Sequence, residues 1–425
     1  MGPGRLINRL AVVVAVGLCL TAAPPAFAGD PSPETATATV DAASPGRDRV
    51  RMNRRVFDRV WSEVRSQYYD PDLHGVDWNA ARRTFRPRAL AAADDRALYA
   101  ALNEMLDLLD DDHAGAAPPA VARRQATLRE RRPAIGVSLR AIDPASGRYR
   151  VERVRPGSPA DRAGVRAGWT LATGGPGQWS PEQDVEAGQP VHLAFTDETG
   201  APRPLQVAPE MLDPEPAFVA DRSRPGVVVL RVEGFEPGLG DWMGEQLART
   251  GPDTDVVVDL RGNPGGRLIE ADAVLSCFLP RDLRWATRTG RSGRTVEMRT
   301  AGGCGPLEGP APHEVVVLVD GDSRSAAELT PAALQEAGRA LVIGEPTAGA
   351  VLISQETRLP DGGKLTLSRA DFVTAAGVRL EKRGVTPDLP AEAEGDAALL
   401  AAIAVLSGPT LAAAASVEGG AAPGL

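Results

Sequence analysis

The chain has 425 residues, a length that allows two or three domains, and 43% of its residues are hydrophobic, which is enough to form buried cores. The formal net charge is −9, and no basic run is interleaved with aromatic side chains, so the composition argues against nucleic-acid binding. No CxxC or HExxH motif occurs, and the sequence indicates neither a metal nor another cofactor.

The N-terminus has the pattern of a secretory signal peptide. Arg5 and Arg9 precede an apolar segment, residues 11–23, which is too short to span a membrane. The sequence AFA (26–28) then provides a small-x-small cleavage site. We therefore predict a signal peptide over residues 1–28, export to the periplasm or the extracellular space, and no stable membrane insertion. A retained N-terminal anchor is the alternative.

Residues 29–48 are polar and rich in Pro, Ala and Thr, which indicates a flexible linker. Segment 49–118 then has the apolar period of helices, so we predict a small helical N-terminal domain. Residues 118–132 read as a second linker. The expected core positions of the helical domain are Val56, Val60, Trp61, Val64, Leu98, Leu102, Met105, Leu106 and Leu109.

Residues 130–212 change to short strand patterns with one short helix, which predicts a small β-rich domain. From 214 to 406, apolar runs alternate with helical stretches, which predicts an α/β domain with a largely parallel sheet. Its strand candidates are Val227–Val232, Val256–Leu260, Val315–Val319 and Ala340–Ile343. The arginine-rich segment 281–299 is hairpin-like, and residues 407–425 are Ala/Gly-rich and predicted to be a disordered tail.

Cleavage of the signal peptide leaves two cysteines, Cys277 and Cys304. Two cysteines do not complete a zinc site by themselves. One disulfide in an oxidising compartment and two buried free thiols are both compatible with the sequence.

Ser325 stands at the start of a predicted helix that follows the Val315–Val319 strand. Unpaired N–H groups and the helix dipole favour developing negative charge at this place, so a serine here can act as a nucleophile beside an oxyanion site. Ser325 and Glu328 also have the S-x-x-E spacing of a capping box, in which the serine only satisfies backbone N–H groups. Taken alone, this window is more typical of a helix cap.

Five stretches of the chain occur together in one order. They are LLDDDHAG (108–115), GSPADRAGVRAG (157–168), DLRGNPGG (259–266), SRSAAEL with GRALVIGEPTAG (323–349) and GVRLEKRGVTPDLP (377–390). In this order they resemble the C-terminal processing, or tail-specific, serine peptidases, including their tricorn-like and retinoid-binding-like relatives. The resemblance covers about residues 50–400. It implies a multidomain α/β protein with a helical N-terminal domain, a PDZ-like domain and a serine peptidase core of crotonase/ClpP-like strand–helix arrangement.

The resemblance implies that Ser325 is the nucleophile. The backbone N–H groups of Gly265, Gly266 and Ala326 are then the expected oxyanion hole, since glycines let N–H groups approach a reacting carbonyl. A plain strand-to-helix turn is the alternative for the glycines. Asp259 is expected to brace this loop together with the neighbouring arginine.

The base is where this chain departs from the better-known branch of the family. In the branch with a Ser–Lys dyad the GEPTFGK-type stretch ends in the catalytic lysine, and this chain has Ala350 there. In the tricorn-like branch a histidine of a D/S-x-H motif and a glutamate near the GV-x-PD end serve instead. These positions are His113 and Glu381, the expected base and acid of a triad.

Each of these residues has a plainer interpretation. His113 can be a solvated histidine after a helix end, and Glu381 a surface charge that pairs with Lys382 or Arg383. The only lysines are Lys364 and Lys382, and a relocated Ser–Lys dyad would have to use one of them.

The sequence therefore predicts an exported serine endopeptidase that cleaves polypeptides through an acyl-enzyme on Ser325, with His113 as base. The PDZ-like domain is expected to capture a polypeptide C-terminus by strand addition beside AIGVSL (134–139). Trp169 stands where the family usually has Asp, which weakens that part of the match. The alternative is a non-catalytic ligand- or peptide-binding protein on the same scaffold, because the lysine is lost. The substrate and the oligomeric state do not follow from the sequence.

Overall fold

The protein is described here in a computed structural model. The predicted signal peptide, most of the 29–48 linker and residues 409–425 of the predicted tail lie outside the described residues. The described residues are 45–127, 130–143, 147–173, 179, 183–392 and 395–408.

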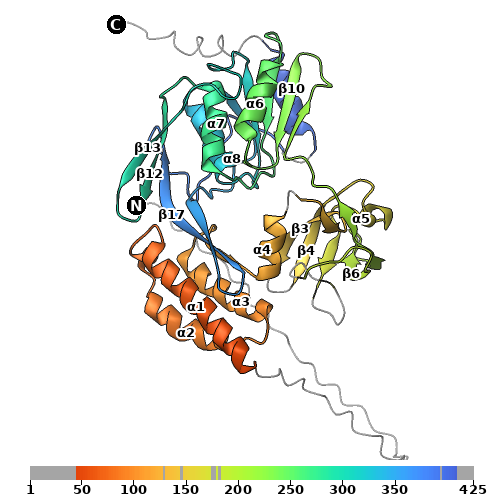
Figure 1. Ribbon diagram of the computed structural model, residues 1–425. Coiled ribbons are helices and arrows are strands. Elements are labelled where there is room, and N and C mark those ends of the chain that lie inside the picture. The colour runs from red at the N-terminus through yellow and green to blue at the C-terminus, as the bar shows by residue number, and fades with distance from the viewer. Residues whose placement is uncertain are drawn as a thin grey trace, which may run out of the picture. The chain divides into compact units, whose positions relative to one another are not determined.

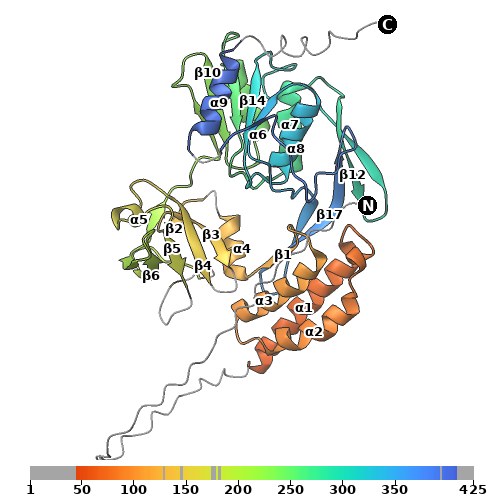
Figure 2. The ribbon, with the colours of Figure 1, turned by 180° about the vertical axis from the view of Figure 1, so that it is seen from behind.

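The N-terminal region is helical (Figures 1 and 2). Its elements are α1 (Arg47–Gln67), η1 (Leu73–Gly75), α2 (Trp78–Ala91), α3 (Asp95–Leu106) and η2 (Asp107–Leu109). Asp77 and Asp94 cap α2 and α3 with their side chains, which accept backbone N–H groups in the first turn. All of the predicted core positions are buried, because α1 and α3 turn the side chains at 3.6-residue spacing toward one another.

A sheet of antiparallel strands joins this helical region to later parts of the chain. Its strands are β1 (Gly115–Ala117), β12 (Arg284–Gly290), β13 (Thr295–Arg299), β16 (Ile353–Arg358) and β17 (Lys364–Thr374). The predicted hairpin within 281–299 is confirmed as β12 and β13. The strand β1 pairs with β17, with Gly115 opposite Thr366, and Leu365 and Leu367 of β17 complete the helical core.

Residues 119–212 form a β-rich module. Its elements are α4 (Pro119–Ala126), β2 (Arg132–Ala134), β3 (Val137–Asp143), β4 (Arg148–Val154), α5 (Pro159–Arg162), β5 (Thr170–Ala172), β6 (Val191–Thr196), β7 (Pro202–Val207) and β8 (Glu210–Leu212). Strands β3 to β7 make one antiparallel sheet in chain order, with β3 at an edge, while β2 pairs with β8. The helix α4 lies in the predicted 118–132 linker. It buries no residue, so no apolar period announces it in the sequence.

The C-terminal half is built on a six-stranded sheet with the order β18-β15-β14-β11-β10-β9. Its strands are β9 (Phe218–Asp221), β10 (Val227–Val232), β11 (Asp255–Asp259), β14 (Val315–Val319), β15 (Leu341–Gly344) and β18 (Leu389–Pro390), and its helices are α6 (Leu239–Ala248), α7 (Leu268–Phe278), α8 (Ala326–Glu336) and α9 (Ala397–Leu406). All pairings are parallel except that of β9 with β10. The four strand predictions are confirmed to within one residue at each end.

Helices cover both faces of this sheet (Figures 1 and 2). Val315, Val317 and Val319 of β14 belong to the core that includes α6, α7 and α8. Val316 and Leu318, which alternate with them, pack with α9 on the opposite face. Because both faces are covered, the strand is apolar throughout, as expected for a central parallel strand.

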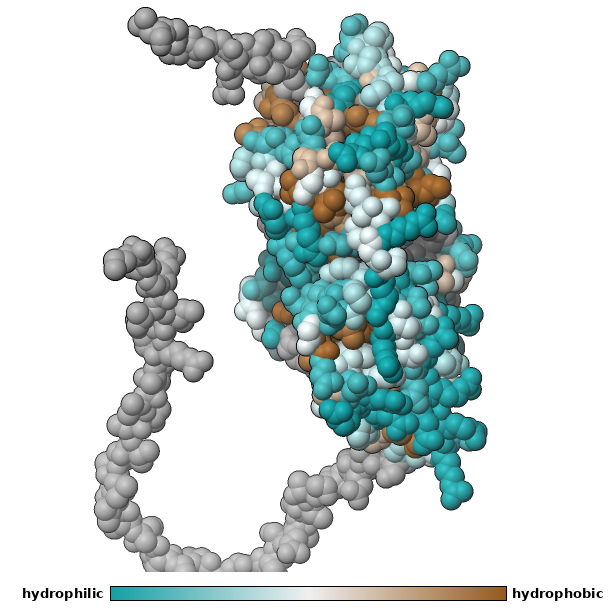
Figure 3. Space-filling view, turned by 90° about the vertical axis from the view of Figure 1, so that its left-hand side faces the viewer, coloured by the Kyte–Doolittle hydropathy of each residue, from teal (hydrophilic) through white to brown (hydrophobic). Residues whose placement is uncertain are grey.

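Cys277 at the end of α7 forms a disulfide with Cys304, and their Cα atoms are 5.0 Å apart. Of the two possibilities that the sequence leaves open, the structure thus has the disulfide. None of the helices in the described ranges is both long and apolar enough to cross a bilayer. The face drawn in Figure 3 is mainly hydrophilic, with apolar side chains in scattered areas.

Candidate active site

Ser325 lies between β14 and α8, where the sequence predicts the start of a helix. Its backbone has φ 54° and ψ −116°. A residue that only caps a helix ordinarily has an extended backbone, whereas this region is sparsely populated by residues with a Cβ. The capping box that the sequence predicts for Ser325 and Glu328 is present as well. Because strain of this kind is concentrated at functional sites, the half-buried Ser325 is also a candidate functional residue.

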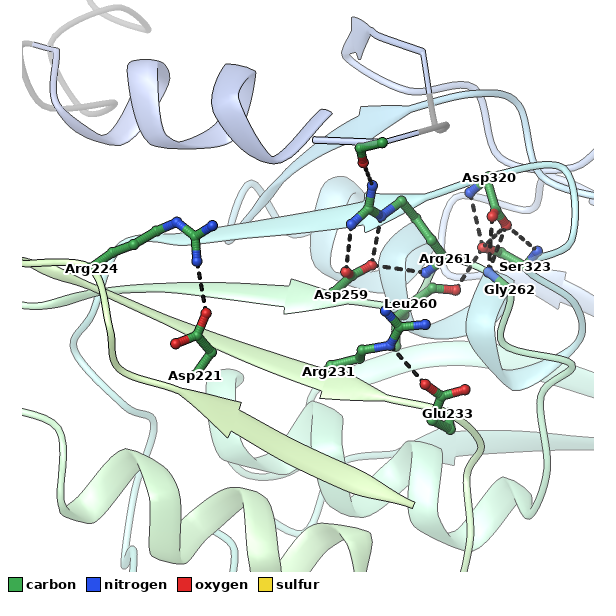
Figure 4. Close-up of polar contacts among 11 residues, drawn as sticks. Asp221, Arg224, Arg231, Glu233, Asp259, Leu260, Arg261, Gly262, Asp320 and Ser323 are labelled. Carbon is green, nitrogen blue, oxygen red and sulfur yellow. Dashed lines mark hydrogen bonds and ion pairs between the residues drawn. The ribbon is translucent and has the colours of Figure 1, made fainter. Parts of the chain in front are cut away.

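The loops after β11 and β14 are tied together by Asp320 and Ser323, which shortly precede Ser325 in the sequence (Figure 4). Both oxygens of the Asp320 carboxylate accept the N–H of Gly262 at 2.9 Å. Ser323 is fully buried, and its hydroxyl donates to the carbonyl oxygen of Leu260 at 2.8 Å. The Ser323 side chain is therefore engaged in holding the loops and is not a second candidate nucleophile.

Asp259 and Arg261 brace the same region, as the sequence predicts (Figure 4). The guanidinium donates from Nε and Nη2 to the two oxygens of Asp259 at 2.9 and 2.8 Å. Its Nη1 reaches the carbonyl oxygen of Gly395 at 3.0 Å. This forked pair fixes the end of β11 from which the glycine loop departs.

The glycine loop passes directly against Ser325. A Cβ on Gly265 (φ 93°) would lie 2.8 Å from the Cβ of Ser325, so only glycine allows this approach. The Gly265 N–H already donates to the side-chain oxygen of Asn263 at 2.8 Å. Within the described ranges, the N–H groups of Gly266 and Ala326 have no acceptor. Of the three expected oxyanion donors, these two are the ones left available.

Glu328 holds the segment around Ser325 from within. Its carboxylate is fully buried and accepts four hydrogen bonds. Its Oε1 accepts from the Thr347 hydroxyl at 2.6 Å and from the Gly349 N–H at 2.7 Å. Its Oε2 accepts from the N–H groups of Ser325 and Ala350, both at 2.9 Å. The glutamate of the S-x-x-E pattern thus acts as an anchor for two loops.

The position of the family's lysine lies beside the serine, because the Ser325 N–H donates to the Ala350 carbonyl oxygen at 2.8 Å. The buried methyl group of Ala350 cannot accept a proton. The ammonium of Lys382 pairs with Asp112 at 3.1 Å and Asp110 at 3.3 Å. Burial lowers the pKa of Lys382, but these ion pairs outweigh it and hold that pKa above its usual value.

Lys364, the other lysine, lies in β17 and pairs with Glu356 of the neighbouring strand at 2.5 Å. Both lysine side chains are thus engaged in ion pairs with carboxylates.

His113 lies two residues before β1, and the pairing of β1 with β17 fixes the loop that carries it. The side chain is only 13% exposed, and its Nδ1 is 3.9 Å from Oδ1 of Asp111. Burial lowers the pKa of His113, the negative charges of Asp111 and Asp112 oppose this, and the positive charges of Arg324 and Lys382 lower it further. The imidazole is therefore neutral at pH 7, as a general base must be.

A continuous series of contacts connects the His113 loop to Ser325. The backbone N–H of Lys382, whose ammonium binds the acids on either side of Asp111, donates to the Gly349 carbonyl oxygen at 2.7 Å. Gly349 in turn donates to Glu328, which accepts the Ser325 N–H. These hydrogen bonds link the segments that carry the two sequence-predicted residues, and the positive charge of Arg324, the residue before Ser325, is among those that lower the pKa of His113.

Glu381 is buried, with 5% of its surface exposed, so it is not the surface charge of the plainer interpretation. Its Oε2 accepts the Val351 N–H at 2.9 Å. Burial raises the pKa of Glu381, the Val351 hydrogen bond lowers it, and the negative charge of Asp111 raises it again.

Sequence reasoning does not single out Asp111 or Tyr68, although both are buried polar groups next to the predicted site. The signal for Asp111 is its place as the first residue of the D/S-x-H motif. Tyr68 follows the last residue of α1 and carries no motif. In the part of the chain that the structure describes, no three His, Cys, Asp or Glu side chains gather in a way that would hold a metal ion.

Comparisons with known proteins agree with this organisation. Residues 226–391 match the family model of peptidase family S41, and residues 51–107 match that of the tricorn protease C1 domain. The carboxyl-terminal-processing protease of Picosynechococcus sp. is 27% identical over 345 residues, which cover 78% of this chain and 81% of that protein. The chloroplastic C-terminal processing peptidase of Tetradesmus obliquus is 28% identical over 377 residues, 81% of this chain and 78% of that protein.

Among solved structures, the photosystem II D1 C-terminal processing protease matches with a TM-score of 0.57 at 24% identity, over 84% of this chain and 97% of that one. This likeness supports the fold. The two family models follow one another along the chain in the order that the sequence motifs predict, and the relatives extend over most of its length. The chain is therefore a serine-type peptidase whose residues 226–391 match peptidase family S41 and whose relatives include carboxyl-terminal-processing proteases.

Proposed function

We propose that this protein is an exported endopeptidase that cleaves polypeptides through an acyl-enzyme on Ser325. The observation that carries the proposal is the strained Ser325 backbone beside Gly265, with the N–H groups of Gly266 and Ala326 unpaired next to it. Donors that are fixed in place before the reaction stabilise the negative charge that develops on a carbonyl oxygen under attack.

His113 is the base in this proposal. Its Nε2 takes the proton as Ser325 Oγ attacks the peptide carbonyl carbon, and it returns that proton to the leaving amine. Water then attacks the acyl-enzyme and gives a proton to the same nitrogen. His113 returns this proton to Ser325 Oγ as the acyl–oxygen bond breaks, which releases the new carboxyl end and restores the serine. A carboxylate beside the ring steadies the imidazolium, and the sequence pattern assigns this place to Glu381. The depressed pKa of His113 and the ion-paired lysines support the tricorn-like assignment over a relocated Ser–Lys dyad.

The β-rich module is assigned as PDZ-like and the core as crotonase/ClpP-like. A cleft of about 470 Å³ is lined by residues 132–139 and by Arg153 and Arg155, and it opens beside the edge strand β3. An edge strand pairs with an extended peptide. Arg153 in this cleft already pairs with Glu215 and Glu233, so the strand edge is the feature that favours peptide binding. These features support capture of the substrate's C-terminus by this module.

Covalent labelling tests the proposal directly. A fluorophosphonate is expected to label the wild-type protein at Ser325, identified by peptide mass spectrometry, and S325A is expected to remain unlabelled. The Ser325→Ala variant is expected to fold, because loss of a cap costs about 1 kcal/mol. Labelling of S325A, or labelling mapped to Ser323, would refute the assignment. Absence of both labelling and turnover of unfolded polypeptides, together with binding of a small apolar ligand, would favour the non-catalytic alternative.

A further inference from the structure

Asp111 makes the most direct contacts of any acidic side chain with His113. Its Oδ1 accepts the backbone N–H of His113 at 2.9 Å and lies 3.9 Å from the ring Nδ1. The Asp111 side chain has no exposed surface. Among the charges that change the pKa of His113, that of Asp111 has the largest effect, followed by those of Asp112, Arg324 and Lys382.

Three buried polar atoms in this region have no hydrogen-bond partner among the described residues. They are Oδ2 of Asp111, Nδ1 of His113 and the hydroxyl of Tyr68. Burial raises the pKa of the Tyr68 hydroxyl, and the charge of Asp111 and a hydrogen-bonding interaction with its carboxylate, outside the ordinary geometry of a hydrogen bond, raise it further. Leaving buried polar groups without hydrogen bonds is energetically unfavourable, so such a cluster requires an explanation.

We propose that Asp111, and not Glu381, is the positioning residue that holds Nδ1–H of His113 and stabilises the imidazolium. This inference rests on the proposed function, in which His113 takes the Ser325 proton. The present separation of 3.9 Å is longer than a hydrogen bond. Catalytic hydrogen bonds in free enzymes are often long and shorten in the substrate complex. With Nδ1 directed to Asp111, Nε2 is the nitrogen left to face the serine.

The stabilisation arises mainly in the transition state. At rest no lysine or arginine within the described ranges forms an ion pair with the buried Asp111 carboxylate, and Lys382 pairs with Asp110 and Asp112 instead. When His113 accepts a proton, the new imidazolium supplies the missing positive charge and the missing donor together. An interaction that is stronger in the transition state than in the ground state accelerates the reaction.

Glu381 has a different task in this arrangement. Its Oε2 accepts the N–H of Val351, the residue after Ala350, whose carbonyl oxygen accepts the Ser325 N–H. It therefore fixes the segment that lines the serine, and its own charge acts less on the His113 ring than that of Asp111.

The test compares four variants in steady-state kinetics across pH. D111N keeps the size of the side chain and the oxygen that accepts the His113 N–H, so the turn persists. We expect it to lower the plateau kcat by about 10²–10⁴-fold with little change in KM, as in other triads. D112N is the matched control, because it removes an equal charge one residue away. Its plateau kcat is expected to stay within about 3-fold of wild type.

Removing the charge of Asp111 or that of Asp112 shifts the acidic limb of the pH profile of kcat in the same direction. Asp111 and Asp112 raise the pKa of His113, whereas Arg324 and Lys382 lower it, and burial together with the charge of Asp111 raises the pKa values of Tyr68 and Glu381. D111N and D112N are therefore both expected to move the acidic limb of the kcat profile to lower pH. The two variants are distinguished by the plateau value of kcat alone. E381Q is expected to lower the plateau by less than about 10-fold.

A proton NMR measurement gives a readout besides activity. Below the His113 pKa, wild type is expected to show a strongly deshielded Nδ1–H resonance that H113A and D111N lack and that D112N and E381Q retain. The inference is overturned if E381Q abolishes that resonance and matches H113A in kcat while D111N behaves like D112N. Full activity of H113A would instead refute the proposed base, and the Asp111 assignment with it, so the two failures are distinguishable.

Discussion

At the scale of single residues, the site depends on side chains that are absent as much as on those present. Gly265 has positive φ, and a Cβ there would meet the Cβ of Ser325 at 2.8 Å and the nitrogen of Ala326 at 3.2 Å. Gly262, in the same loop, also has positive φ but nothing within 4 Å of a Cβ. The two glycines therefore separate backbone strain from steric conflict with the nucleophile.

We predict that Gly265→Ala lowers kcat/KM by at least about 10²-fold, because it displaces Ser325 and the oxyanion donors. Gly262→Ala is the control. Both variants lose roughly 1–2 kcal/mol of stability to the left-handed backbone, which thermal unfolding measures. Equal activity losses in the two variants would show that strain alone, and not the approach to Ser325, matters.

The pH dependence follows from the environment of His113. Because burial and the charges of Arg324 and Lys382 lower its pKa, the deprotonated base persists below the usual value of about 6.5. We expect kcat to rise with pH through an apparent pKa below that of free imidazole and then to level off. His113→Ala should reduce kcat by about 10³–10⁴-fold, measured on an unfolded polypeptide substrate.

Substituting the two lysines tests the alternative mechanism, a relocated Ser–Lys dyad. The double variant K364A/K382A should keep most of the plateau activity, since both ammonium groups stand in ion pairs. If the double variant is inactive and H113A retains activity, a relocated Ser–Lys dyad operates and the histidine mechanism is wrong.

At the scale of elements, α8 is anchored by its own first turn. Glu328 receives four hydrogen bonds from two loops, which is all that its two oxygens can accept in this geometry. We predict that Glu328→Gln costs about 3 kcal/mol or more of unfolding free energy, because the amide nitrogen cannot accept and faces N–H donors. Glu336→Gln, at the exposed end of the same helix, should cost less than about 0.5 kcal/mol. Urea unfolding curves measure both, and equal costs would contradict the anchoring role.

The helices and strands also show which parts of the fold can be predicted from the sequence. The four predicted strands are found because a strand covered on both faces is an unbroken apolar run, and the helical core is found because its period repeats over several turns. The helix α4 was missed because it buries nothing, and the burial of Glu381 was missed because its charged neighbours suggest a surface. Asp111 stands among three consecutive aspartates, and only tertiary packing distinguishes the buried one.

At the scale of the whole molecule, the thiols report on the predicted export. The signal segment contains Cys19, while Cys277 and Cys304 are joined in a disulfide. We predict that secreted protein begins near Gly29 and has no free thiol under denaturing, non-reducing conditions. N-terminal sequencing and thiol titration check this. One thiol per chain and an N-terminus at Met1 would indicate a retained anchor.

The pairing of β1 with β17 has a consequence for the time at which the enzyme becomes active. His113 lies early in the chain, whereas Ser325, the β17 strand that fixes the His113 loop, and Glu381 lie late. An exported chain is threaded across a membrane from its N-terminus, so its early part emerges without the strand that completes the site. We therefore expect the peptidase to be inactive during export, so that it cleaves neither the export machinery nor itself until nearly the whole chain has been translocated.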